Sequence, residues 1–263
     1  MKILGIDTSG TVAGVALSED GKLIASSRLQ FKLTHSETLM PMMEKIKELT
    51  NLDMASLDYI AVTSGPGSFT GLRIGASAAK GLADALGKRI LAVPTLDVIS
   101  WQMYGTSGLV CPMLDARRAQ VYTGVYEFVP ESVKGEREML AFRMNSLLSV
   151  RAVAVEDLIA DLKKIYIEKY GNIAQERWDT PHKPCVFLMG DGVPVVQQQI
   201  KELLTVPYTV VPFHRDRQSA EAVCALGEKI AAMGKSISPE EFDLIYLRPS
   251  QAERMKQEKE NQK

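Results

Sequence analysis

The chain has 263 residues and a formal charge of −1, from 31 basic and 32 acidic side chains. This length can bury a core without disulfides, and the balanced charge excludes the basic surface that tight, autonomous nucleic-acid binding requires. The three cysteines lie far apart in apolar runs, which predicts reduced thiols, and no run approaches the ~20 apolar residues of a membrane helix, so we expect a cytoplasmic protein without membrane contact.

The first half of the chain predicts alternating strands and helices. The expected elements are strands at 2–6, 12–17, 23–29, 59–64 and 90–93, and helices at 36–49, from the glycine-rich turn to about 86, and at 96–104. Asp7 follows the first strand directly and begins a small polar turn. This order is typical of one α/β unit.

The second half repeats this order. Two strands with a polar turn between them are expected within 110–128; the further elements are a strand near 138–143, a helix from 154, a strand from 185, a helix over 195–204, a strand over 208–213 and a helix over 218–233. Asp115 takes the place of Asp7, and 190–192 takes the place of 65–67. We therefore predict an internal duplication with lobes at 1–107 and 108–250 and a charged, disordered tail at 251–263. We also expect Ser238 to cap a helix that begins at Pro239.

Duplicated halves that open with strand, aspartate turn and strand resemble the fold shared by actin, sugar kinases and heat-shock ATPases (the ASKHA fold). The resemblance implies two related lobes with mixed sheets flanked by helices. In that superfamily the two turns face each other across a cleft, where backbone amides bind the phosphates of ATP and the aspartates organise Mg²⁺. The residues alone leave a second interpretation open, in which both aspartates only form turns.

A vestigial nucleotide cleft is the site that this resemblance implies. Its candidate residues are Asp7, Thr8, Ser9, Asp115, Arg117, Gly190 and Gly192. The stretch "DARRA" at 115–119 departs from the superfamily, which favours glycine and small residues where the backbone approaches an anion, and this argues against tight ATP binding. We expect Arg117 and Arg118 to lie in the following strand on opposite faces, so that one lines the cleft. A solvated pair is the alternative.

Five motifs indicate a particular family. "IDTS", "HSETLMP", "GPGSFTGLRIG", "LDARRAQVY" and "YLRPSQAE" occur in this order. Together they closely resemble the bacterial TsaB (YeaZ) family of tRNA threonylcarbamoyladenosine biosynthesis proteins, over residues 1 to about 253 and most specifically over the first 120. Residues 129–184 carry no motif that we can assign.

The resemblance implies a subunit that is non-catalytic or only weakly active by itself. Members of the family pair with the catalytic paralogue TsaD and, with the ATPase TsaE, transfer a threonylcarbamoyl group to adenosine 37 of tRNAs that read codons starting with A. It therefore implies that ATP and Mg²⁺ are used through partner subunits, that no cofactor binds tightly to this chain, and that tRNA is contacted mainly through the complex. We expect a homodimer when the chain is alone.

The histidines do not predict a metal site. The paralogue binds its metal through two histidines four residues apart on a helix, whereas this chain has His35, His182 and His214, with no such pair. We interpret His35 as a hydrogen-bonding residue at the start of a helix; a ligand or a general base is the alternative.

The glycine-rich stretch 64–75 raises the question of a phosphate loop. It does not match the spacing GxxxxGK[ST], so the small residues of the following helix suggest another use. Glycine inside a helix costs about 1 kcal/mol relative to alanine, which a close neighbour should offset. That neighbour is either the chain's own sheet or, as the resemblance implies, two helices of the paralogue. The expected partner interface comprises His35, Glu37, Leu39, Met42, Met43, Phe69, Gly71, Arg73, Gly75 and Ala79. The methionines can equally belong to the core.

Two functions from different classes remain in competition. One is a non-catalytic scaffolding and activating subunit of the tRNA-modifying complex. The other is a stand-alone ATP-dependent kinase or ATPase of the actin-like fold. A kinase needs a base and a loop that holds the nucleotide, and the only glycine-rich loop in the second half is "GDG", so no catalytic residue is assigned and the scaffold is favoured.

Overall fold

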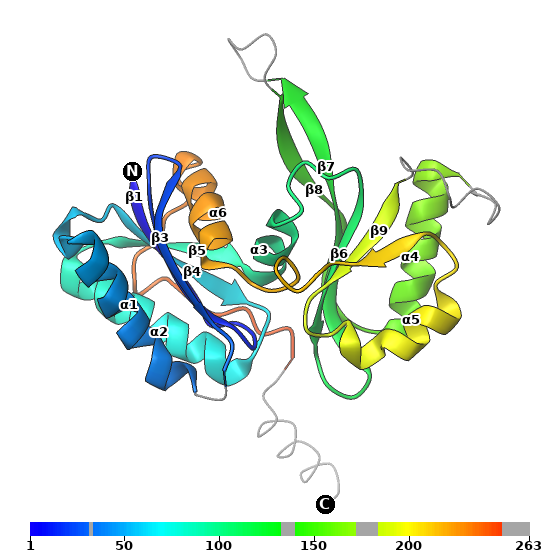
Figure 1. The fold of residues 1–263 in the computed structure, drawn as a ribbon, viewed down its shortest axis with the longest axis horizontal. Coiled ribbons are helices and arrows are strands. Elements are labelled where there is room, and N and C mark those ends of the chain that lie inside the picture. The colour runs from blue at the N-terminus through cyan, green and yellow to red at the C-terminus, as the bar shows by residue number, and fades with distance from the viewer. Residues whose placement is uncertain (32–33, 133–139, 172–183, 249–263) are drawn as a thin grey trace, which may run out of the picture.

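The computed structural model describes residues 1–31, 34–132, 140–171 and 184–248. The predicted tail 251–263 and His182 lie outside the described residues. The described chain forms two five-stranded sheets, each covered by helices, which lie side by side in Figure 1. None of the helices in these described ranges is both long and apolar enough to cross a membrane.

The first sheet has the strand order β3-β2-β1-β4-β5. Its strands are β1 (Lys2–Asp7), β2 (Ala13–Glu19), β3 (Lys22–Leu29), β4 (Tyr59–Gly65) and β5 (Arg89–Pro94). The first three strands are antiparallel, whereas β4 and β5 run parallel to β1. One face is covered by α1 (His35–Thr50) and α2 (Phe69–Leu86), with the short 3₁₀ turn η1 (Met54–Ser56) between them in the chain.

The second sheet repeats the first. Its strands are β6 (Gly108–Asp115), β7 (Gln120–Ser132), β8 (Leu140–Ala154), β9 (Cys185–Met189) and β10 (Tyr208–Val210). The strand order β8-β7-β6-β9-β10 corresponds, strand by strand, to β3-β2-β1-β4-β5 of the first sheet. The parallel and antiparallel pairs are also the same. The predicted duplication is therefore confirmed. On one face lie α4 (Val155–Tyr170), the turn η3 (Pro194–Val196) and α5 (Gln197–Leu203).

Strand β8 is much longer than the sequence predicts. We expected a strand near 138–143, whereas β8 runs to Ala154 and pairs with β7 along its length. The outer part of this hairpin projects beyond the body of the sheet (Figure 1). In this part Phe142 and Met144 alternate with Arg143 and Asn145 and pack, partly buried, against the core around Leu96 and Tyr126, a pattern that the expected range covered only in part.

Two helices are exchanged between the lobes. Helix α6 (Ala220–Ala232) follows the second sheet in the chain, yet its buried side chains pack on Ile3, Ala61 and Leu91 of the first. Helix α3 (Thr95–Trp101) follows the first sheet, and its Leu96 and Ile99 pack in the core of the second sheet. The helix expected at 218–233, within the predicted second lobe of 108–250, thus covers the first sheet, because an apolar helical face does not specify which sheet it covers.

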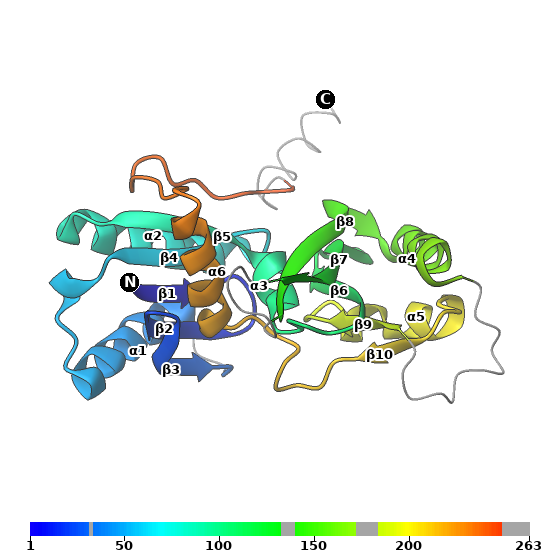
Figure 2. The ribbon, with the colours of Figure 1, turned by 90° about the horizontal axis from the view of Figure 1, so that it is seen from above.

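The chain after α6 crosses back over the first lobe toward the second (Figure 2). Ser238 and Glu241 exchange the expected capping hydrogen bonds, but only a single turn forms and the predicted helix is absent. Phe242, which follows this turn, is buried in the first core. We call residues 243–248 the strap. They pack against the body, where the Ile245 amide donates to the Ser64 carbonyl and Leu244 contacts the first core.

Candidate functional site

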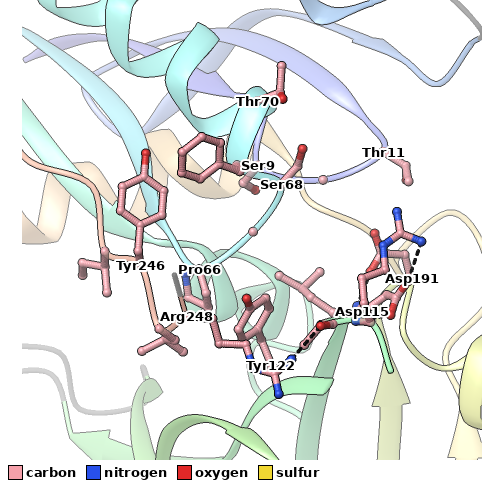
Figure 3. A pocket seen from close by; sticks show the side chains of 18 residues that line it. Ser9, Thr11, Pro66, Ser68, Thr70, Asp115, Tyr122, Asp191, Tyr246 and Arg248 are labelled. Carbon is pink, nitrogen blue, oxygen red and sulfur yellow. Dashed lines mark hydrogen bonds and ion pairs between the residues drawn. The ribbon is translucent and has the colours of Figure 1, made fainter. Parts of the chain in front are cut away.

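A cleft of about 550 Å³ lies between the two lobes (Figure 3). Three segments line it: the turn after β1 with the start of α2, the turn after β6, and the strap. The polar or aromatic side chains that face it are Ser9, Thr11, Ser68, Phe69, Thr70, Asp115, Arg117, Tyr122, Asp191, Tyr246 and Arg248. The sequence predicted this cleft from the two aspartate turns, and the structure places both turns at its edge.

Asp7 lies behind the first turn rather than in the cleft. Its Oδ1 accepts hydrogen bonds from the backbone and hydroxyl of Ser9, at 2.9 and 2.7 Å, and from the hydroxyl of Thr63. Its Oδ2 is buried and has no hydrogen-bond partner among the described residues. Burial therefore raises the pKa of Asp7 to about 6, although these hydrogen bonds oppose the shift. Its role here is to shape the turn.

Thr8 explains the small residues of α2. Its hydroxyl donates to the carbonyl of Gly71 at 2.7 Å. A Cβ added at Gly71 would lie 2.1 Å from the Thr8 carbonyl oxygen, and one at Gly75 would lie 2.4 Å from the Thr8 hydroxyl oxygen. The glycines thus let the first turn approach the helix backbone, so this face of α2 is directed at the chain's own hairpin and not at a partner.

The second turn is occupied by the chain's own carboxylates. The amide of Asp115 donates to Oδ1 of Asp191 at 3.1 Å, and the amide of Arg117 donates to Oδ1 of Asp115 at 2.7 Å. The guanidinium of Arg117 also pairs with Asp115 at 3.2 Å. Burial is the main cause that raises the pKa of Asp191, and the nearby charge of Asp115 adds to it.

The two arginines form the turn itself, not the following strand as predicted. Arg117, Arg118 and Ala119 all have left-handed backbone conformations, with φ of 65°, 55° and 56°, and β7 begins only at Gln120. Three successive left-handed residues let the chain reverse, at a cost that glycine would avoid. The alternation of faces that we expected applies only to extended backbone.

Gly190 and Gly192 do not line the cleft. The amide of Gly190 donates to the carbonyl of Asp216 and that of Gly192 to the carbonyl of Met113. An added Cβ at Gly190 would lie 2.1 Å from the Met113 carbonyl oxygen, so these glycines permit close approach of two backbones. The amides of Gly190 and Gly192, like those of Asp115 and Arg117 in the second hairpin, are therefore bonded within the chain and not free to bind a phosphate.

Most of the predicted partner-interface residues are buried. Leu39, Met42, Met43 and Ala79 belong to the first core, which settles the methionines as core residues. Their placement at a partner surface was wrong, because the apolar stripes of α1 and α2 face their own sheet. Gly71 and Gly75 are buried against the first turn, as described above.

The remaining interface candidates lie at or near the surface. His35 is half-buried and its Nε2 is 2.8 Å from the carbonyl oxygen of Gly10, which confirms its interpretation as a hydrogen-bonding residue at a helix start. Glu37 is exposed and caps α1 through Thr34. The two helices therefore have an inner face, which carries the buried candidates, and an outer face, which carries the exposed or half-buried ones.

The strap contacts two of the outer candidates. The guanidinium of Arg73 lies 3.9 Å from the ring centre of Phe69, and its Nε donates to the hydroxyl of Tyr246 at 3.2 Å. The rings of Phe69 and Tyr246 are 5.0 Å apart. Arg248 then donates to the carbonyl of Ala116 in the second turn at 2.9 Å, so the strap joins the two lobes.

The sequence did not identify the strap as a wall of the cleft. "YLRPSQAE" carried part of the family resemblance, but a segment without apolar periodicity does not indicate where it docks. Tyr122 was missed for another reason, since it alternates with buried neighbours in β7 like any strand residue. Within the described ranges, no group of three or more His, Cys, Asp or Glu side chains is placed to hold a metal ion.

An outer groove of about 590 Å³ runs between α1 and α2 on the surface of the first lobe. Its walls include Ser36, Met40, Arg73 and Ser77, with Ile74 half-buried at its floor. Met40 is 59% exposed and contributes apolar surface to this groove. The two predicted docking helices therefore lie next to each other, and the groove between them is lined by the predicted Leu39, Phe69 and Arg73 together with residues that were not predicted, such as Met40.

The repeated sheet order, with an aspartate turn from each lobe at one cleft, defines the duplicated actin-like class of α/β proteins. Residues 30–234 match the sequence model of the family described as "TsaD: tRNA N6-adenosine threonylcarbamoyltransferase", and the chain belongs to this family. The chain is 42% identical over 130 residues to the tRNA threonylcarbamoyladenosine biosynthesis protein TsaB of Bacillus subtilis, covering 49% of this chain and 56% of the relative. It is 33% identical over 130 residues to TsaB of Escherichia coli, covering 48% and 55%.

Solved structures agree with these relatives. The fold matches a Pseudomonas aeruginosa protein described as similar to peptidase YEAZ, with a TM-score of 0.69 and 25% identity over 94% of this chain and 99% of that one. YeaZ from Pseudomonas aeruginosa gives a TM-score of 0.67 and 24% identity, over 93% and 100%. The expected resemblance to the TsaB (YeaZ) family is therefore confirmed. The aligned sequence nevertheless spans little more than half of the two TsaB relatives.

Proposed function

We propose that this chain is a non-catalytic scaffolding and activating subunit in the biosynthesis of threonylcarbamoyladenosine in tRNA. In this proposal it binds the catalytic paralogue TsaD in the cytoplasm and, with it, the ATPase TsaE. The complex then transfers a threonylcarbamoyl group to adenosine 37 of tRNAs that read codons starting with A. Two relatives named as tRNA threonylcarbamoyladenosine biosynthesis proteins support this role.

The observation that carries the non-catalytic role is the self-occupied second turn. Two amides of this turn, those of Asp115 and Arg117, are bonded to the carboxylates of Asp191 and Asp115, and both carboxylates would repel an anion. We therefore propose that ATP and Mg²⁺ act through the partner subunits. A stand-alone kinase or ATPase is supported less well, because its phosphates would have to displace these internal hydrogen bonds.

The outer groove between α1 and α2 is the surface that we propose for TsaD. It combines exposed apolar area at Met40 with small residues at Ser36 and Ser77, over which another helix can pack closely. In the absence of TsaD, the same surface would pair with a second copy of the chain. Contact with tRNA would come mainly from the partners, since this chain has a net charge of only −1.

Reconstitution tests the role. The purified chain is mixed with its TsaD and TsaE counterparts, ATP, threonine, bicarbonate, the adenylate-forming enzyme and unmodified tRNA, and the modified nucleoside is measured. We expect modification to require this chain. Equal modification without it would refute the scaffold, and rapid ATP turnover by the chain alone would favour the enzyme.

Met40→Glu tests the surface. Placing a charge in the outer groove should weaken TsaD binding at least tenfold, because a carboxylate would be desolvated in an apolar interface. Val195→Glu is the matched control, since Val195 is similarly exposed at 55% but lies in the second lobe. Equal binding of both variants, measured by calorimetry on folded proteins, would refute this assignment of the interface.

A further inference from the structure

A second, smaller chamber lies at the joint between the two lobes. Its volume is about 320 Å³, and its walls come from Pro94 and Asp97 on the side of the first lobe and from Tyr126 and Met144 of the second. The lining is otherwise apolar, apart from the hydroxyl of Ser146. Pro94, Asp97 and Met144 also line an adjoining groove of about 500 Å³, through which a ligand would reach the chamber.

One buried polar group in this chamber lacks an ordinary hydrogen-bond partner. Tyr126 is only 3% exposed, and its hydroxyl makes no hydrogen bond to any described residue. Buried hydroxyls are nearly always hydrogen-bonded, so this one requires an explanation. Burial is the main cause that raises the pKa of the Tyr126 hydroxyl, and the carboxyl of the neighbouring Asp97 adds to the shift.

The charge of Asp97 is not neutralised by the cations of the groove. Lys229 and Arg143 line the groove, but the Lys229 ammonium lies 5.1 Å from the ring centre of Trp101, and Arg143 bonds to Glu131 at 2.7 Å. No ion pair joins Asp97 to another described residue. Burial raises the pKa of Asp97, as expected for a carboxyl with apolar surroundings and no counterion.

We propose that this chamber binds a small organic ammonium ion, a primary amine with an apolar body. The ammonium group donates to the Asp97 carboxylate, which has no ion pair with a described residue, and to the Tyr126 hydroxyl, which thereby gains a hydrogen-bond partner. The apolar body lies against Pro94 and Met144 and extends toward Trp101 in the groove. A few polar groups in a mainly apolar cavity of this size are typical of small-molecule sites. Since its walls come from both lobes, the ligand would hold the lobes together.

Titration of the isotope-labelled full chain with 2-phenylethylamine tests this proposal by NMR, with 2-phenylethanol as the uncharged analogue. We expect the amine to bind at least tenfold more tightly than the alcohol, because only the amine forms a charge-assisted hydrogen bond. The shifted backbone signals should cluster at Asp97, Tyr126 and Met144. Equal affinities, shifts confined to other regions, or no binding of the amine up to ~10 mM would overturn the proposal.

Asp97→Asn isolates the carboxylate. In a folded variant, the affinity for the amine should fall to that for the alcohol, whereas Asp84→Asn on the exposed end of α2 should leave it unchanged. An unchanged amine affinity in Asp97→Asn would contradict the proposal. If this variant does not fold, the proposal is still tested by comparing the affinities of the amine and the alcohol for the unaltered chain.

Discussion

Asp7 makes the stability of the fold depend on pH in an uncommon direction. Its pKa rises from an ordinary value of 3.8 to about 6 on folding, because burial disfavours the carboxylate. The folded state therefore binds a proton more tightly than the unfolded state. Between these two values the unfolded chain loses its proton first, so stability falls as the pH rises through this window. At 1.36 kcal/mol per pKa unit, the full contribution is about 3 kcal/mol.

Asp7→Asn tests this reasoning. The amide oxygen of asparagine can still accept from Ser9 and Thr63, whereas the side chain no longer titrates. The buried NH₂ group adds a cost of its own, but this cost does not change with pH. The informative quantity is therefore the stability of the variant relative to the parent chain, which should become more favourable by about 2–3 kcal/mol between pH 4 and pH 8.

The assay is urea denaturation of both proteins across this pH range, with circular dichroism as the probe. Other carboxylates titrate equally in both proteins and cancel in the difference. Asp84→Asn removes an exposed carboxyl and serves as the control, for which we expect a nearly constant difference. A difference for Asp7→Asn that is also constant with pH would refute the buried, protonated state of Asp7.

Two further predictions concern glycine and the left-handed turn. Gly71→Ala should destabilise the fold by about 3 kcal/mol, because the new Cβ would meet the Thr8 carbonyl oxygen. Gly81→Ala in the same helix should instead stabilise the fold by about 0.5–1 kcal/mol, since nothing lies within 4 Å of its new Cβ. Thermal unfolding measures both variants, and equal changes in stability would contradict our conclusion that the Gly71 face of α2 points inward. Ala119→Gly should stabilise by about 1 kcal/mol, because φ is 56° at this position, and a loss of stability in denaturant titration would show that the turn is not left-handed in solution.

The sequence predicted the order of the elements and the duplication, because apolar periodicity and turn residues act locally. It also located both aspartate turns, since a strand that ends in aspartate is visible in the chain. It failed where a result depends on two distant segments. Gly71 was interpreted as part of a flat outer surface, but its neighbour is Thr8, and only the folded chain brings them together.

The same reason explains the other differences. In the second turn, the backbone amide of Asp115 donates to the carboxylate of Asp191, which lies 76 residues further along the chain. The strap follows no periodic pattern, because its side chains dock one at a time on Phe69, Arg73 and the second turn. Distinguishing inner from outer faces of α1 and α2 likewise required the sheet that they cover.

The exchange of α3 and α6 makes each half of the molecule incomplete by itself. A first half cut off before α6 would expose the apolar face formed by Ile3, Ala61 and Leu91, and a second half without α3 would lose Leu96 and Ile99 from its core. The two repeats therefore became mutually dependent once each lent a helix to the other. Although the two repeats remain visible in the sheets, neither can complete its core alone, so the two have to fold together.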